Sequence, residues 1–208
     1  MTQKVGKAGV IPADNASLGI PPRQPAGSGG NRAKDLDSGD LGRVGDVHVH
    51  MSLRLQQAFG LRREESIKFQ PSYADRGDHI ALKGSWCKGG RERSLPITTA
   101  EQRAVLDDAH ALAGSGALIP AHKSYIQQRH VYDGQCKAAG LSAMHGLRHA
   151  YAQTLYEALT GWKAPLAGGP DRKALTQEQR ILDIEARQQI SRELGHERIG
   201  VVATYLGR

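Results

Sequence analysis

The distribution of aromatic residues limits where this chain can build a folded core. None of the Phe, Trp or Tyr side chains occurs before Phe59. Residues 1–46 instead contain nine of the 25 glycines and four of the nine prolines. Such a stretch cannot bury enough apolar surface to offset the conformational entropy lost on ordering. The sequence therefore predicts a flexible Gly/Pro-rich tail or linker over residues 1–46 and a folded domain over residues 47–208.

The excess positive charge lies in the predicted domain. The whole chain has 28 Lys and Arg against 21 Asp and Glu, a formal net charge of +7. Six basic and five acidic residues fall within residues 1–46, so residues 47–208 keep a net charge of +6. A basic domain makes nucleic acid the first partner to test. The alternative is that an evenly spread charge serves solubility alone.

Several classes of protein are disfavoured by what the sequence lacks. It contains no run of about 18 apolar residues, the length that predicts a membrane span. The N-terminal stretch lacks the charged and then apolar order of a secretory signal. Two cysteines, Cys87 and Cys136, cannot form a disulfide framework and suit a reducing compartment. We therefore expect a cytoplasmic protein without a membrane partner.

Spacing and capping signals predict a mainly helical domain. Apolar residues recur at helical spacing from Met51 to Phe59, and Gly60 is a plausible helix end. A short helix over residues 62–67 follows, and Pro71 is expected to close that segment. Alternation over residues 77–97 predicts a hairpin or a three-stranded meander. Further helices are predicted by capping pairs and an apolar stripe: Thr98 with Glu101 or Thr99 with Gln102, Ser124 with Gln127, Thr176 with Gln179, and the stripe Leu147, Tyr151, Leu155 and Leu159. The predicted fold class is α+β, mainly α with a small antiparallel β-sheet.

Six residues at informative positions suggest one kind of chemistry. Arg62 opens a helix, Lys88 lies on the predicted hairpin turn, and His145 and Arg148 share a helical face. His196 follows Leu194-Gly195, and Tyr205 comes nine residues later. Two arginines, a lysine, two histidines and a tyrosine are suited to holding a phosphodiester and attacking it.

Each residue type has a physical reason in this hypothesis. Arg62 and Arg148 supply planar, charged forks to the phosphate oxygens. Tyr205 is the nucleophile, and because a free phenol ionises only near pH 10, it needs a base or nearby cations. His145 is the candidate base, and His145 and His196 are candidate hydrogen-bond donors.

Lys88 is placed to protonate the departing 5′ oxygen. No metal, ATP or other cofactor is required, because a phosphotyrosyl bond conserves the energy for rejoining. His145 and His149 at i, i+4 would suit zinc, but Gly146 stands where the zinc-protease motif needs Glu. We therefore expect no metal site.

The joint pattern resembles the catalytic domain of the tyrosine recombinases, the phage integrase family. The residues that carry the resemblance are Gly60-Leu61-Arg62 with Glu65, Lys88-Gly89 before a Leu-Pro-Ile strand, His145-x-x-Arg148-His149, and Leu194-Gly195-His196 with Tyr205. The resemblance covers roughly residues 47–208 and implies a mainly helical domain with a small sheet. It also implies site-specific DNA recombination or integration through a covalent 3′-phosphotyrosyl intermediate. The sequences of residues 59–65 and 192–198 are further similar to an integrase-domain group found on bacterial mobile elements.

The resemblance has further implications and some departures. Double-stranded DNA at attachment sites is the implied partner, with self-association on DNA and no small-molecule substrate. Family members generally carry a core-binding domain before the catalytic one, whereas only the Gly/Pro-rich stretch precedes Val47 here. The 51-residue separation of His145 from His196 is long for the family and points to the loop over residues 162–173 as an insertion.

Two other interpretations, one a DNA-binding protein and one an enzyme, remain open at this point. One is a truncated or decayed integrase that binds DNA without exchanging strands. The other is a nicking and closing enzyme similar to the type IB topoisomerases, which the Leu-Gly-His to Tyr spacing makes less favoured than a recombinase.

Overall fold

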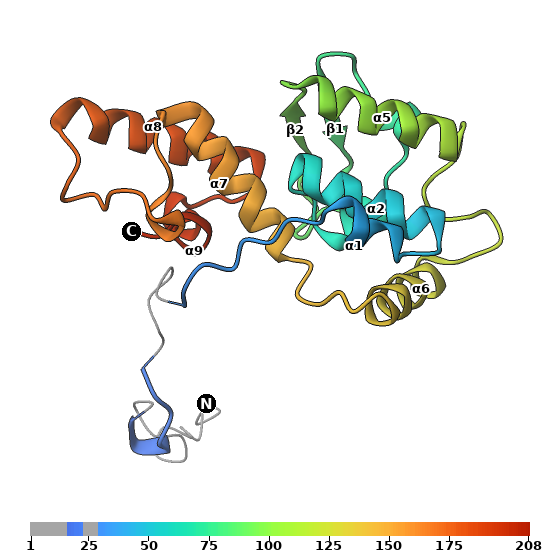
Figure 1. Cartoon of the computed structure of the whole chain (residues 1–208), viewed down its shortest axis with the longest axis horizontal. Coiled ribbons are helices and arrows are strands. Elements are labelled where there is room, and N and C mark those ends of the chain that lie inside the picture. Colours follow the sequence, from blue (N-terminus) through green and yellow to red (C-terminus); the bar gives the residue numbers. More distant parts are fainter. Residues whose placement is uncertain (1–15, 23–28) are drawn as a thin grey trace, which may run out of the picture.

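The computed structural model describes residues 16–22 and 29–208, and this part of the chain is mainly helical with one two-stranded sheet (Figure 1). The predicted fold class is therefore confirmed. The α-helices are α1 (Ser38–Gly42), α2 (Val47–Phe59), α3 (Arg63–Ile67), α4 (Pro71–Ala74), α5 (Ala100–Ala113), α6 (Tyr125–Ala138), α7 (Gly146–Thr160), α8 (Gln177–Glu193) and α9 (Ala203–Leu206). The strands are β1 (His79–Leu82) and β2 (Arg93–Pro96), and short 3₁₀ turns lie at Ala16–Leu18, Gly84–Trp86, Pro165–Ala167 and Ile199–Val202.

Three hydrophobic cores hold the helices together. The first joins one face of α2 to α5 and the hairpin, and includes Phe59 and Leu106. The second joins the other face of α2 to α1, α6 and the start of α7, and includes Leu53. The third joins α7, α8 and α9 around Tyr156 and Ile190. Figure 1 shows α7 and α8 side by side in one lobe, with α2, α5 and the hairpin in the other.

Local signals in the sequence fix the ends of the main helices. The capping boxes predicted at Thr99, Ser124 and Thr176 are all present, each side chain accepting from the backbone N–H three residues on. Gly60 ends α2 with a φ of +59°, and a Cβ there would lie 2.5 Å from Cδ1 of Tyr151. Both the left-handed backbone and the close ring therefore require glycine at this position.

The region between α3 and α5 differs in detail from the prediction. Pro71 begins α4 instead of closing a segment, because its fixed φ suits the first turn of a helix. The meander alternative is wrong, since β1 and β2 form a two-stranded antiparallel hairpin in the described residues. Leu82 pairs with Arg93, so the connecting turn carries Lys88 out beyond the sheet.

The predicted flexible tail is wrong over residues 29–46. Leu36 and Val44 are buried in the second core, and Asp37 caps α1. Side-chain amides supply partners for the main chain of this segment: Gln57 accepts from Leu36 N–H at 2.8 Å, and Gln135 accepts from Gly45 N–H at 2.9 Å. These contacts offset the ordering cost that composition alone suggests. Residues 1–15 and 23–28 of the predicted tail lie outside the described residues.

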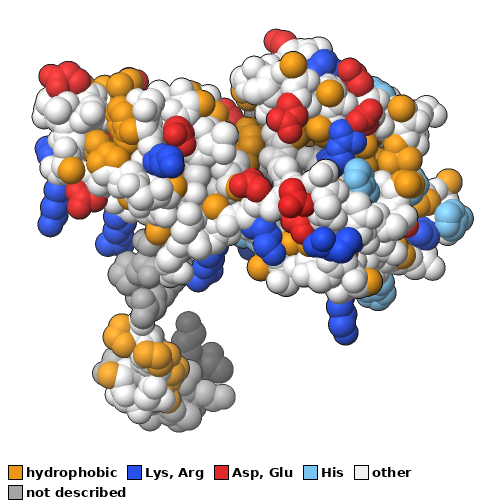
Figure 2. Space-filling view, in the orientation of Figure 1, with side chains coloured by type: hydrophobic (Ala, Val, Ile, Leu, Met, Phe, Trp, Pro, Cys, Tyr) orange, Lys and Arg blue, Asp and Glu red, His pale blue; other side chains and the backbone are white. Residues whose placement is uncertain are grey.

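The surface in Figure 2 carries a hydrophobic patch over the lobe that contains α7 and α8. Ile181, Leu182 and Ile184 of α8 are exposed large hydrophobic residues. Among the described helices none is both long and apolar enough to cross a membrane.

Candidate active site

The six residues predicted for catalysis meet where the three cores adjoin. A pocket of about 610 Å³ is lined by Arg62, Lys88, His145, His196 and Tyr205. Arg148 lies against this pocket, with its Nε atom 3.4 Å from the Tyr205 hydroxyl. Residues that are far apart in the sequence, from five separate segments, therefore come together as the spacing pattern predicted.

Arg148 is the most deeply buried member of the group. Its side chain is 1% exposed, and it projects from α7 between the ends of two other helices. One terminal nitrogen donates to the carbonyl oxygen of Gly60 at 2.5 Å, and the other donates to the carbonyl oxygen of Leu194. Burial, followed by repulsion from Arg62, lowers the pKa of Arg148 to about 10. The guanidinium therefore stays charged at neutral pH, although burying this charge costs free energy.

Arg62 approaches the same carbonyl oxygen from α3. Its Nη2 donates to the Leu194 carbonyl at 3.1 Å, and its Nη1 donates to Oε1 of Glu65 at 2.8 Å. The Arg62 side chain is 21% exposed and faces the pocket. Two guanidinium groups thus share one acceptor at the C-terminal end of α8, where the helix dipole carries partial negative charge.

Tyr205 is held on α9 by contacts to its ring, its hydroxyl and its main chain. The hydroxyl lies 3.3 Å from Nε2 of His196, and the ring centroid lies 4.7 Å from that of His149. The side-chain amide of Gln153 donates to the Tyr205 carbonyl at 2.9 Å. The residue is 5% exposed, so both its ring and its position along the helix are fixed.

The histidines of the site are neutral at pH 7. Burial is the main cause, and neighbouring cations reinforce it: the pKa of His196 is lowered to about 4, and that of His145 is lowered as well. A neutral imidazole has one nitrogen free to accept a proton. The ring centroids of His196 and His145 lie at similar distances from that of Tyr205, 5.6 Å and 6.0 Å. Of these two histidines it is His196 whose Nε2 atom is within hydrogen-bonding distance of the Tyr205 hydroxyl, at 3.3 Å.

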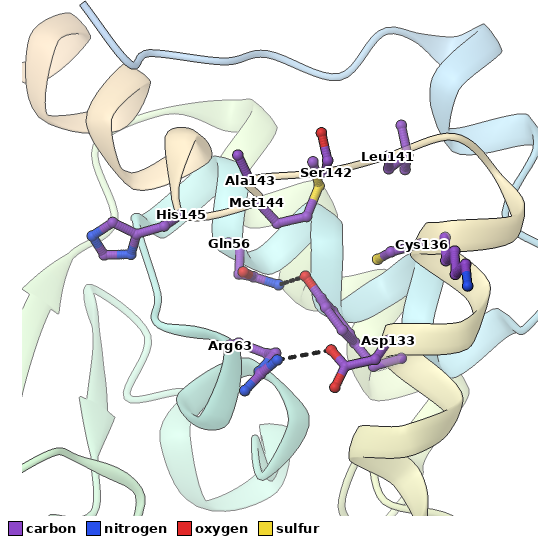
Figure 3. Close-up of a pocket in the computed structure, with 11 residues that line it drawn as sticks. Gln56, Arg63, Asp133, Cys136, Leu141, Ser142, Ala143, Met144 and His145 are labelled. Carbon is purple, nitrogen blue, oxygen red and sulfur yellow. Dashed lines mark hydrogen bonds and ion pairs between the residues drawn. The ribbon is translucent and has the colours of Figure 1, made fainter.

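A second pocket, of about 430 Å³, shares His145 with the first (Figure 3). Figure 3 shows His145 at one edge, on the segment that leads into α7, and Arg63 across the pocket in an ion pair with Asp133. The buried side of this pocket includes Tyr132, whose hydroxyl accepts from Nε2 of Gln56 at 2.9 Å. The second pocket therefore adjoins the first, and His145 lines both of them.

Metal-binding groups of three or more His, Cys, Asp or Glu are absent from residues 16–22 and 29–208. His145 and His149, the pair with zinc-like spacing, instead make an edge-to-face ring contact at a centroid distance of 5.5 Å, and the His149 ring packs at a tilt of 50° against Tyr205.

Three residues close to the predicted set were not predicted as site residues: two of them contact it directly, and Arg93 is linked to it through Glu65. Glu65 accepts hydrogen bonds from Arg62 and Arg93, and the His149 ring packs against Tyr205. Arg93 donates to the carbonyl oxygen of Glu193 at the end of α8. Glu65 and His149 lie inside the quoted motifs, and Glu65 has the i, i+3 spacing to Arg62 that permits a helix-start contact. Arg93 has no comparable signal, because its partners are 28 and 100 residues away.

Comparisons with known proteins identify the family and the fold. The sequence profile described as Integrase matches residues 40–154, more than half of the chain. The chain therefore belongs to the integrase family. No curated protein sequence matches it.

Solved structures share the fold at low sequence identity. A lambda integrase dimer bound to a COC′ core site matches with a TM-score of 0.52 at 16% identity, over 80% of this chain and 45% of that one. A second lambda integrase dimer, of residues 75–356, matches with the same TM-score of 0.52 at 16% identity, over 85% of this chain and 60% of that one. The chain thus spans about half the length of the integrases it matches. The expected tyrosine recombinase catalytic-domain fold is confirmed.

Proposed function

We propose that this chain is the catalytic domain of a site-specific DNA recombinase that cuts and rejoins DNA through Tyr205. The observation that carries the proposal is the environment of the Tyr205 hydroxyl, with His196 at 3.3 Å and Arg148 at 3.4 Å beside a basic pocket. Family membership and the integrase-like fold support the same function. The proposed partner is double-stranded DNA at attachment sites, with self-association of the protein on DNA.

In this proposal the arginines hold the phosphate that is attacked. A guanidinium has five N–H donors. Arg148 uses three of them in the contacts described above, which leaves two for a phosphate oxygen. Arg62 faces the pocket and has donors beyond those given to Glu65 and Leu194. Charged donors already in place stabilise the second negative charge that forms on the phosphate oxygens during attack.

The residues of the site account for each bond and each proton in the covalent step. The Tyr205 oxygen forms a bond to phosphorus as the bond from phosphorus to the 5′ oxygen breaks. His196 accepts the phenol proton, because its Nε2 is already within hydrogen-bonding distance. This assignment replaces the sequence-based choice of His145 as base, and leaves His145 as a donor to the phosphate.

Lys88 delivers a proton to the departing 5′ oxygen from the exposed hairpin turn. It lines the same pocket as Tyr205, so the leaving group is within its reach. Attack of a 5′ hydroxyl on the phosphotyrosine reverses the sequence and rejoins the strand. The energy of the broken bond is kept in the phosphotyrosyl bond, so no cofactor takes part in the proposal.

The test uses nicked duplexes with a randomised sequence around the nick, because the attachment site is unknown. A short fragment diffuses away after cleavage and traps the covalent product. Protein and DNA are then denatured, and the adducts are isolated and sequenced. The expected result is an adduct with a recurrent sequence for the unchanged protein and none for Tyr205→Phe.

Other outcomes would reject specific parts of the proposal. DNA binding without any adduct would favour a protein that binds DNA but exchanges no strands. Adducts without sequence preference, together with relaxation of supercoiled plasmid, would favour a nicking and closing enzyme. DNA affinity that does not fall as salt rises would contradict phosphate contacts.

A further inference from the structure

Arg93 occupies a junction between three parts of the site. It begins β2, and its side chain is 7% exposed. Its terminal nitrogens donate to both carboxylate oxygens of Glu65, each at 2.7 Å, and its Nε donates to the carbonyl oxygen of Glu193 at 2.8 Å. A weaker contact joins it to Sγ of Cys87 at 3.3 Å, directly before Lys88.

Glu65 is the group for which Arg93 and Arg62 compete. Its side chain is fully buried, and both of its oxygens also accept from Arg62, one from the backbone N–H at 2.7 Å and one from Nη1 at 2.8 Å. Burial raises the pKa of this carboxyl, but the hydrogen bonds and charge of Arg93 outweigh burial and lower the pKa to about 2. The carboxylate is therefore charged at neutral pH and requires cationic partners.

We propose that Arg93 is a positioning residue that saturates Glu65 and so leaves the guanidinium of Arg62 free for the phosphate. Its consequence for catalysis rests on the function proposed above. With Arg93 bonded to both oxygens, Arg62 makes one side-chain bond to Glu65 and one to the Leu194 carbonyl, and its remaining donors are available at the pocket that it lines. Without Arg93, the buried carboxylate draws Arg62 into a bidentate pair and withdraws it from the pocket.

Arg93 also holds the end of α8 that both catalytic arginines contact. It binds the Glu193 carbonyl, one residue before the Leu194 carbonyl that accepts from Arg62 and Arg148. Gly195 follows with a φ of +64°, and a Cβ there would lie 3.1 Å from Cδ of Arg93. The stem of Arg93 therefore packs directly against the turn that leads to His196.

The experiment measures how accessible Arg62 is, independently of any DNA reaction. Phenylglyoxal modifies exposed arginines, and peptide mass spectrometry gives the rate at each residue, with exposed Arg91 as internal reference. In Arg93→Met we expect Arg62 to react about tenfold more slowly, because it gains a charge-assisted bond. In the double variant Arg93→Met with Glu65→Gln, the rate returns towards that of the unchanged protein, because no buried charge remains to capture Arg62.

A matched control is available in a second arginine that pairs with a carboxylate. Arg103 donates through both terminal nitrogens to Asp75, in contacts that include none of the catalytic residues. Arg103→Met should leave the modification rate of Arg62 unchanged. Adduct formation on the nicked duplexes should fall strongly in Arg93→Met and recover in part in the double variant, whereas a merely structural role for Arg93 would make the double variant no better.

Unchanged or faster modification of Arg62 in folded Arg93→Met overturns the proposal, as does absence of recovery in the double variant. If Arg93→Met does not fold, Arg93→Lys carries the test, because one ammonium cannot bind both oxygens and an intermediate protection of Arg62 is expected. If the unchanged protein forms no adduct, the proposed function fails, but the phenylglyoxal rates still decide the role of Arg93.

Discussion

Arg148 should contribute little to the stability of the fold although it is fully buried. Its bonds to the carbonyls of Gly60 and Leu194 have a charged donor, and such hydrogen bonds contribute about 1.5–3 kcal/mol each. Against this, its pKa is lowered from 12.5 to about 10. Because one pKa unit corresponds to about 1.4 kcal/mol, holding the charge costs roughly 3 kcal/mol. The two bonds together contribute about 3–6 kcal/mol, so a net stabilisation of about 0–3 kcal/mol remains.

Two substitutions separate the charge from the hydrogen bonds. Arg148→Met keeps an unbranched side chain, removes the charge and leaves the Leu194 carbonyl with its bond from Arg62. The Gly60 carbonyl loses its donor, and we expect the free energy of unfolding to fall by about 3 kcal/mol or less. Arg148→Lys keeps the buried charge but cannot bridge two carbonyls, and should lose about 2 kcal/mol.

Urea unfolding followed by circular dichroism at pH 7 gives the free energies, with an unchanged m-value as the test that the unfolded states are comparable. Arg103→Met is the control for removing a paired, partly exposed arginine, and should cost about 1 kcal/mol or less. A loss well above about 3 kcal/mol in Arg148→Met would refute the reasoning. Both variants should still abolish the Tyr205 adduct.

Three further predictions concern pH, the N-terminal segment and anions. Burial lowers the folded pKa of His149 from 6.5 to about 4, so the folded state binds fewer protons and stability should fall as pH drops between these values. After allowance for solvent screening the loss from His149 is about 2 kcal/mol, and urea unfolding of His149→Phe should show the pH dependence reduced by that amount, with the part due to His196, whose pKa is also lowered to about 4, remaining. In Gly146→Ala the new Cβ would lie 2.7 Å from the Arg32 carbonyl oxygen, so residues 29–36 should exchange amide hydrogens faster while α7 stays protected. At constant ionic strength, inorganic phosphate at ten times its dissociation constant should stabilise the unchanged protein by about 1.4 kcal/mol, and Arg62→Ala by much less, measured as a shift in thermal unfolding.

The sequence predicted those features that depend on neighbours along the chain. The capping boxes at Thr99, Ser124 and Thr176 and the helix end at Gly60 are set by contacts within a few residues. The packing of residues 29–46 was not predictable, because the partners of its main chain are the side chains of Gln57 and Gln135, distant in sequence. Composition indicates how much apolar surface a segment has, but not which distant side chains will hydrogen-bond to its main chain.

The same distinction between local and long-range contacts applies to the site. The six predicted residues have local spacings or an order that resembles a family, so they were found without coordinates. The contacts that set their chemistry are long-range: Arg148 meets Gly60 across 88 residues and Tyr205 across 57. For this reason the sequence could not show which histidine hydrogen-bonds to the phenol. In the structure it is His196 whose Nε2 atom lies within hydrogen-bonding distance of the Tyr205 hydroxyl.

The unbalanced charge of the site connects its stability with its proposed function. The guanidinium groups of Arg62, Arg93 and Arg148 meet at the end of α8 and are paired directly with one carboxylate, that of Glu65. The helix end supplies a further partial charge of about −0.5, so about 1.5 positive charges remain uncompensated. A phosphodiester carries one negative charge and gains a second during attack. Burial is the main cause of the lowered pKa of Arg148 and repulsion from Arg62 adds to it; we expect bound phosphate to relieve that repulsion, and most fully in the transition state.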